Sequence, residues 1–152
     1  LYPASDILVF ARNPREREFA MELGAAWSGD TEDRPPAAPA AIIDTTPAWK
    51  PVLAGMECLA PGGRMVINAI RKESNDQGIL QQLDYARHLW REKQLRTVAN
   101  VTRADVRECL DLAVKIPLTP EVSTYPLAQA NQALQELKAG DIRGAKVLKI
   151  RE

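Results

Sequence analysis

Two stretches of the chain decide its fold: residues 41–46 read AIIDTT, and residues 59–70 read LAPGGRMVINAI. The apolar start of the first stretch and the run MVI in the second are typical of buried parallel strands. Between them, apolar side chains recur at helical spacing, at Val52, Leu53, Met56 and Leu59. The Pro-Gly-Gly turn at residues 61–63 separates this helix from the second strand. Strand, helix and strand in this order predict one unit of a parallel sheet.

The same alternation continues on both sides of this unit. Upstream, strands are predicted over residues 7–10 and 25–27, and Asn13 and Pro14 are typical of the N-cap and first position of a helix between them. Downstream, we expect a helix over residues 79–93, a strand over residues 95–98, a helix over residues 104–114, an amphipathic helix over residues 127–137 and a closing strand over residues 145–150.

This order of elements predicts an α/β fold with a doubly wound parallel sheet and helices on both of its faces. The sheet domain is expected to span residues 1–118. Residues 119–152 differ, because an extended, partly polar stretch leads into an amphipathic helix and a last strand. We interpret them as a segment that packs with another unit.

The charge balance excludes some classes of partner. Lys and Arg number 20, as do Asp and Glu, so the net charge is zero. No global basic field therefore favours nucleic acid or an anionic membrane as a partner. The longest apolar runs also fall far short of a membrane span.

The cysteines and the histidine are predicted to have structural roles. Cys58, Cys109 and His88 do not follow any metal-ligand spacing. Each cysteine lies on an apolar helical stripe and is expected to be a buried free thiol in a reducing cytoplasm. His88 lies in a charged segment and is expected on the surface.

Five pieces of the chain, in the right order, resemble the zinc-type (medium-chain) alcohol dehydrogenase family. Besides the two stretches quoted above, they are VFARNPREREFAMELGA at residues 9–25, LRTVANVTRAD at residues 95–105 and YPLAQANQALQELKAGDIRGAKVL at residues 125–148. The resemblance implies a Rossmann-like cofactor domain whose second, fourth, fifth and sixth strands are present here. It also implies that the last piece returns into a catalytic domain.

The resemblance also shows what this sequence does not contain. The family's first strand and its Gly-x-Gly-x-x-Gly turn would precede Leu1, and no such glycine spacing occurs in the chain. The cysteine and histidine ligands of the family's zinc are not in this sequence either. We therefore expect a fragment of a parent that interconverts alcohols and aldehydes with a nicotinamide cofactor. The fragment alone is expected to be inactive, because it lacks the zinc that polarises the substrate oxygen.

The resemblance favours NADP as the cofactor, with NAD as the alternative. Enzymes that use NAD carry an acid at the end of the second strand, where it binds the ribose hydroxyls, and that position here is Ala11. Arg12, Asn13 and Arg15 follow, and arginine binds a phosphate through two parallel hydrogen bonds, which suits a 2′-phosphate. The opposing interpretation is a solvated helix start with ordinary arginines.

The rest of the predicted cofactor site follows the fourth, fifth and sixth strands of the family. It consists of Thr45, Thr46, Asn68, Ala69, Ile70, Val98 and Ala99. No residue of this chain is predicted to be catalytic or to bind metal. Trp90 precedes the sixth strand, where members of this family pair edge strands, so the resemblance implies a cytoplasmic homodimer for the parent.

Three alternative functions stay open. The segment LAPGGRMVI also resembles a methyltransferase, but Ala11 and Arg12 do not supply the ribose-binding acid of that family. A phosphoacceptor receiver domain would use Asp44, but it needs an acidic pair after its first strand that this sequence lacks. A zinc-free quinone reductase of the same superfamily is distinguished only by residues outside this sequence.

Overall fold

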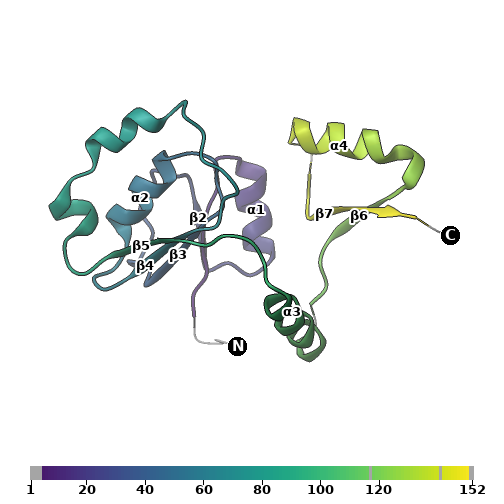
Figure 1. Ribbon diagram of the computed structural model, residues 1–152, viewed down its shortest axis with the longest axis horizontal. Helices are drawn as coiled ribbons and strands as arrows, with labels where there is room; N and C mark the ends of the chain where they lie inside the picture. The colour runs from purple at the N-terminus through teal and green to yellow at the C-terminus, as the bar shows by residue number, and fades with distance from the viewer. Residues whose placement is uncertain (1–4, 117, 141, 151–152) are drawn as a thin grey trace. The chain divides into compact units, whose positions relative to one another are not determined.

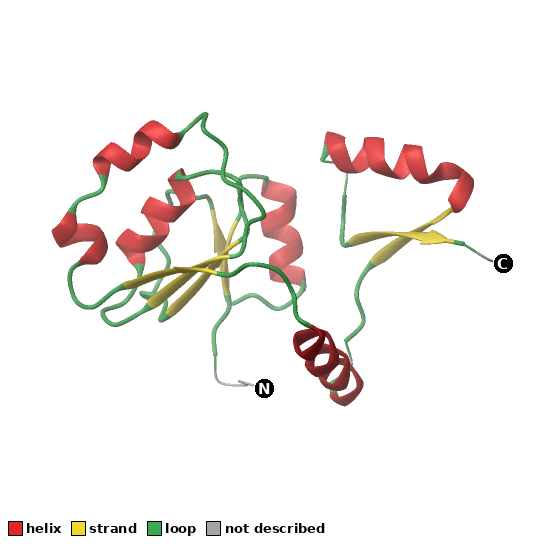
Figure 2. Cartoon of the chain, viewed as in Figure 1, coloured by secondary structure: helices red, strands yellow, loops and turns green. Residues whose placement is uncertain are grey.

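The chain folds into two units, shown by Figure 1 and Figure 2. The computed structural model describes residues 5–116, 118–140 and 142–150. The first unit ends at Asn100 and the second begins at Val101. Both units combine helices with parallel strand pairs, which confirms the predicted α/β class.

Helix α3 (Arg103–Lys115) lies in the second unit. The boundary expected from the sequence lay further along the chain, between residues 118 and 119. Among the residues that the structure describes, no helix is both long and apolar enough to cross a membrane.

Strands β1 (Leu8–Phe10) and β2 (Trp27–Gly29) form a parallel pair joined by helix α1 (Pro14–Glu22). Helix α1 begins as the sequence predicts, because the Asn13 side chain accepts a hydrogen bond from the backbone N–H of Arg15 at 3.0 Å. This bond satisfies one of the N–H groups that the first turn of a helix leaves without a partner.

Strand β2 begins at Trp27, the residue where the predicted strand ends. Gly24 adopts a φ of 96°, which reverses the chain after the helix, and the backbone N–H of Ala25 still bonds to Ala20 of the helix. The strand therefore starts later than the apolar pattern indicates. Its Trp27 ring packs edge-on against Phe10 of β1, with ring centroids 5.1 Å apart.

Strands β3 (Ala41–Asp44), β4 (Arg64–Ile67) and β5 (Gln94–Thr97) form a parallel sheet with β4 in the centre. Helix α2 (Lys50–Cys58) connects β3 to β4 and lies across one face of this sheet (Figure 1). The buried core between helix and sheet consists of Val52, Met56, Leu59, Met65 and Ile67. The alternation of each strand directs these side chains to the covered face.

The opposite face of this sheet is more exposed. Ile43, whose side chain alternates with the covered positions of β3, is 72% exposed. The second helical layer expected from the sequence is therefore not present over Ile43 in the described structure. One covered face is enough to form the core, because the covered face carries the buried apolar residues.

Both ends of helix α2 are held by charged side chains from distant parts of the chain. At its start, Asp76 accepts hydrogen bonds from the backbone N–H groups of Trp49 and Lys50 at 2.8 and 2.9 Å. At its end, Lys93 donates to the carbonyl of Met56 at 2.6 Å. The signs suit the helix dipole, with an anion at the N-terminus and a cation at the C-terminus. The bonds from Lys50 and Trp49 lower the pKa of Asp76, and burial lowers the pKa of Lys93.

The helix predicted over residues 79–93 is wrong as one continuous element. The structure has a 3₁₀ helix, Gln77–Gln82, and then one π-helical turn, Tyr85–Leu89. The break occurs at Asp84, whose side chain caps the second turn by accepting from the backbone N–H of Arg87 at 2.8 Å. Local capping by Asp84 therefore outweighs the continuous apolar pattern.

His88 is buried, which corrects the expectation that it lies on the surface. It is 2% exposed, and its Nδ1 lies 2.9 Å from the backbone nitrogen of Asp84. A polar ring that is removed from water needs such a partner.

The two cysteines have different surroundings. Cys58 is half-buried, as its apolar stripe predicts, and burial raises the pKa of its thiol. Cys109 is exposed, which corrects the expectation of a buried thiol. The cause is that helix α3 leaves its apolar stripe open, since Val106 and Leu110 are exposed as well.

The strands of the first unit form two separate sheets. Among the described residues, no strand pairing joins β1 to β3, so each of these strands has a partner on one edge alone. In the usual order of a Rossmann sheet, 3-2-1-4-5-6, strands β2 and β1 match the first two positions and β3, β4 and β5 match the last three. In that order, the position between β1 and β3 belongs to the first strand.

The second unit contains a parallel pair of strands and two helices. Helix α3 begins with a capping box, in which Thr102 and Asp105 bond to each other's backbone N–H groups. Strands β6 (Val122–Pro126) and β7 (Ala145–Lys149) are connected by a 3₁₀ turn and helix α4 (Ala130–Ala139). Gly140 ends this helix with a φ of 78°, a left-handed conformation that favours glycine.

A polar cluster joins α4 to both strands of this unit. Lys146 donates to Glu136 at 2.5 Å and to the Tyr125 hydroxyl at 2.9 Å, and that hydroxyl donates to Glu136 at 2.6 Å. The hydrogen bond from Lys146, followed by the bond from Tyr125, lowers the pKa of Glu136 to about 2. The cluster therefore fixes the helix against both strands.

Truncation of Met56 tests the core. Met56 is 1% exposed, so we expect Met56→Ala to lower the free energy of unfolding by about 2–5 kcal/mol through lost burial and a cavity. Met21→Ala is the matched control, because Met21 is 46% exposed and should change stability by about 0.5 kcal/mol or less. Urea unfolding followed by circular dichroism measures both. Equal losses in the two variants would contradict this core.

The pH dependence of stability tests the Glu136 cluster. The pKa of Glu136 is lowered from 4.5 to about 2, so its contribution is complete above about pH 4.5 and disappears as the pH falls towards 2. The melting temperature of Glu136→Gln should therefore be lower than that of the wild type at pH 6, and the two should converge near pH 2. Glu108→Gln, in the exposed part of α3, is the control. A difference that is constant with pH would contradict the assignment.

Candidate functional site

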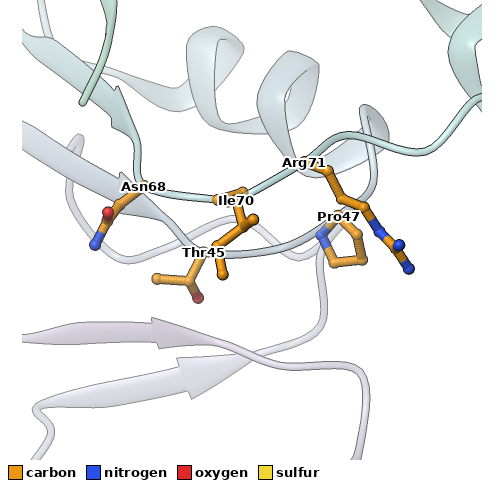
Figure 3. A pocket seen from close by; sticks show the side chains of 6 residues that line it. Thr45, Pro47, Asn68, Ile70 and Arg71 are labelled. Atoms are coloured by element: carbon orange, nitrogen blue, oxygen red, sulfur yellow. The ribbon is translucent and has the colours of Figure 1, made fainter. Parts of the chain in front are cut away.

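A pocket of about 300 Å³ lies at the carboxyl ends of strands β3 and β4 (Figure 3). Its lining residues are Thr45, Pro47, Asn68, Ala69, Ile70 and Arg71. Figure 3 shows that they come from two segments, because Thr45 and Pro47 follow β3 whereas Asn68, Ile70 and Arg71 follow β4. Ligands of open parallel sheets bind at this edge, so the pocket is the candidate site.

The register of the sheet brings these segments together. Asp44 pairs with Ile67, and the backbone N–H of Asn68 donates to the carbonyl of Asp44 at 2.7 Å. The N–H of Val98 likewise donates to the carbonyl of Ile67 at 3.2 Å. The three strands therefore end at the same level, and the residues after them emerge side by side.

Lys72 connects the two walls of the pocket, which are the segments that follow β3 and β4. Its ammonium group forms an ion pair with Asp44 and donates to the carbonyls of Thr46 and Ala48 at 2.9 and 2.7 Å. Asp44 also accepts from the hydroxyl of Thr46 at 2.8 Å. The side chains of Lys72 and Asp44 are 11% and 3% exposed, so this pair is largely removed from water. Nothing in the spacing of the sequence indicated that Lys72 would reach back across the sheet edge.

Four of the predicted cofactor residues lie around this pocket, namely Thr45, Asn68, Ala69 and Ile70. Thr46 is not among the lining residues, and its hydroxyl donates to Asp44 instead. Val98 and Ala99 follow β5 at the same edge but do not line the pocket. The sequence analysis did not include Arg71 in the site, although its place directly after Ile70 was a usable signal.

The other three predicted residues follow strand β1, in the two-stranded sheet. The Asn13 side chain caps helix α1, while Arg12 and Arg15 are exposed. None of the three lines the pocket described above. The sequence also missed Arg17, which donates to the carbonyls of Ala11 and Arg12 at 2.7 and 3.1 Å and so fixes the turn after β1.

Two other kinds of site have no support in the geometry. Among the residues that the structure describes, no group of three or more His, Cys, Asp or Glu side chains is placed to hold a metal ion. Asp44, the residue that a receiver domain would phosphorylate, is 5% exposed and already paired with Lys72. A phosphoacceptor must be accessible, so the structure disfavours that alternative.

Comparison with known proteins gives the family. Residues 30–148 match the family model described as zinc-binding dehydrogenase. The chain is 39% identical over 150 residues to a protein of Mycobacterium tuberculosis named probable alcohol dehydrogenase AdhA, and the match covers 99% of this chain and 42% of that protein. The chain therefore belongs to the zinc-binding dehydrogenase family, and it spans less than half the length of this relative.

Solved structures show the same fold. A cinnamyl alcohol dehydrogenase of Sorghum bicolor matches 97% of this chain and 43% of its own with a TM-score of 0.75 and 23% identity. The Bacillus subtilis protein yhfP with NAD bound matches 95% and 47%, with a TM-score of 0.69 and 15% identity. The yhdH oxidoreductase of Salmonella enterica in complex with NADP matches 96% and 47%, with a TM-score of 0.68 and 16% identity. The Rossmann-like fold predicted from the sequence is thereby confirmed, and the family is one of oxidoreductases.

Replacing Lys72 tests the ion pair. Lys72→Met leaves the Asp44 carboxylate buried without its partner, so we expect the free energy of unfolding to fall by about 3–5 kcal/mol. The double variant Asp44→Asn/Lys72→Met removes both charges and should recover about 1–3 kcal/mol of that loss. Urea unfolding of the two variants and the wild type measures the difference. A double variant less stable than Lys72→Met would contradict the burial of this pair.

Proposed function

We propose that this chain forms the cofactor-binding part of a nicotinamide-dependent alcohol dehydrogenase that interconverts alcohols and aldehydes. The observation that carries the proposal is the pocket at the ends of β3 and β4, which four residues chosen from the sequence line. Its place at the carboxyl ends of parallel strands is where this type of sheet binds dinucleotides. Membership in the zinc-binding dehydrogenase family favours this function over a methyltransferase.

The residues around the pocket fit the nicotinamide half of such a cofactor. The pocket is open, it measures about 300 Å³, and Thr45 and Asn68 offer polar side chains with exposed surface. Ile70 is fully exposed beside them and offers an apolar surface for a flat ring. When bound, the cofactor supplies the carbon that gives or accepts a hydride. The role of this chain is to hold and orient that ring.

The turn after β1 fits the adenosine half and carries the proposed preference for NADP. Ala11 supplies no carboxylate to repel a 2′-phosphate, and the Arg12 side chain is exposed and available. Arg17 holds the backbone of Ala11 and Arg12 through its hydrogen bonds, so the turn is ordered before a ligand arrives. Arg12 and Arg15 therefore act as the phosphate-binding side chains in this proposal.

The substrate and the zinc belong to the remainder of the proposed enzyme. The relative from M. tuberculosis is named an alcohol dehydrogenase, and this chain corresponds to 42% of it. The described residues contain no set of metal ligands, so no step of the reaction through zinc is assigned to them. We propose a cytoplasmic homodimer as the working assembly, as the family resemblance implies, and expect the isolated chain to have no dehydrogenase activity.

Cofactor affinities test this proposal. The polypeptide that the gene encodes should bind NADPH at least about tenfold more tightly than NADH, and Arg12→Ala should remove most of that difference because one guanidinium–phosphate contact is lost. Arg34→Ala is the matched control, because Arg34 is an exposed arginine with one long ion pair to Glu57 at 3.8 Å. Quenching of protein fluorescence measures the affinities. Equal affinity of the wild type for the two cofactors would overturn the NADP preference.

A further inference from the structure

Lys72 does not line the candidate pocket, yet it touches both of its walls. It belongs to the segment after β4, which carries Asn68 and Ile70, and its ammonium group bonds to the segment after β3, which carries Thr45 and Pro47. The ammonium lies 5.7 Å from the centre of the Trp49 ring, so an aromatic face adds to its surroundings. One side chain thus joins the two segments at four points.

Two further contacts join the same segments. The backbone N–H of Glu73 donates to the carbonyl of Pro47 at 2.8 Å. Asp76, further along the segment after β4, accepts hydrogen bonds from the backbone N–H groups of Trp49 and Lys50. It therefore fixes this segment to the start of helix α2. Lys72 directly follows Arg71, which lines the pocket, and directly precedes Glu73. Hydrogen bonds of Lys72, Glu73 and Asp76 therefore connect the segments that line the pocket to each other and to helix α2.

The lining side chains have little packing of their own. Thr45, Asn68 and Ile70 are all exposed, so neighbouring side chains do not hold them in place. Their positions depend on the backbone, and the backbone of the β3 segment is held by the bonds of Lys72 to Thr46 and Ala48. A buried ammonium with three oxygen partners is costly to disrupt, which makes it suited to hold a site in one shape.

We infer that Lys72 is a positioning residue for the nicotinamide half of the cofactor. This inference rests on the proposed function, since it takes the pocket after β3 and β4 as the place of the nicotinamide ring. Lys72 acts through the backbone of Thr46 and Ala48, and it needs no contact with the cofactor itself. Loss of Lys72 should weaken binding of the whole dinucleotide, because a loosened wall must be ordered again on binding. Binding of the adenosine half, which lies against the turn after β1, should not change.

The experiment compares a whole cofactor with half of one. NADPH and adenosine 2′,5′-bisphosphate are titrated into the wild type, Lys72→Met and Lys50→Met forms of the polypeptide that the gene encodes. We expect Lys72→Met to lose about tenfold or more in affinity for NADPH and less than about twofold for the bisphosphate. Lys50→Met is the matched control, because Lys50 is 46% exposed and pairs with Glu32 at the surface. It should leave both affinities within about twofold of the wild type.

A second variant covers the case in which Lys72→Met does not fold. Asp44→Asn/Lys72→Met leaves no unpaired charge in the interior, and it should show the same selective loss of NADPH affinity. Unchanged NADPH affinity, or an equal loss for NADPH and the bisphosphate, would overturn the positioning role while the proposed function stands. A wild type that binds neither compound would overturn both proposals.

Discussion

The buried ammonium of Lys72 is the interaction on which the candidate site depends. Parallel strands end in separate loops, and the sheet itself does not determine how those loops face each other. Here the loop after β4 sends Lys72 back to Asp44 and to the carbonyls of the loop after β3. The two segments that line the pocket are therefore joined to each other and to the strands that carry the buried core residues Met65 and Ile67.

The edge of the sheet that carries the pocket also depends on helix α2. A carboxylate binds the N-terminus of this helix and an ammonium group binds its C-terminus, as the helix dipole favours. Asp76 and Lys93 come from segments on either side of the irregular 3₁₀ and π-helical stretch, so that stretch is fixed to the core although its own turns are short. By contrast, among the described residues β4 is hydrogen-bonded to a strand on both sides, whereas β3 has a partner strand on one side alone.

Much of the fold could be predicted from the sequence, because its signals are local. The runs before Asn13 and Thr45 alternate with capped helices, and Gly140 ends a helix where the pattern stops. The errors arise where a particular side-chain partner, rather than the apolar pattern, determines the structure. His88 is buried because Asp84 breaks a helix that the apolar pattern makes continuous. Four pocket residues were found because strand ends are visible in the sequence, whereas Lys72 was missed because its partners lie more than twenty residues away along the chain.

The proposed place of the nicotinamide ring is at the ends of β3 and β4. A crystal structure of the polypeptide that the gene encodes, determined with NADP⁺ bound, would test this proposal. We expect the nicotinamide ring to contact Thr45 and Asn68 while the 2′-phosphate lies beside Arg12. A dinucleotide bound elsewhere, with this pocket empty, would contradict it.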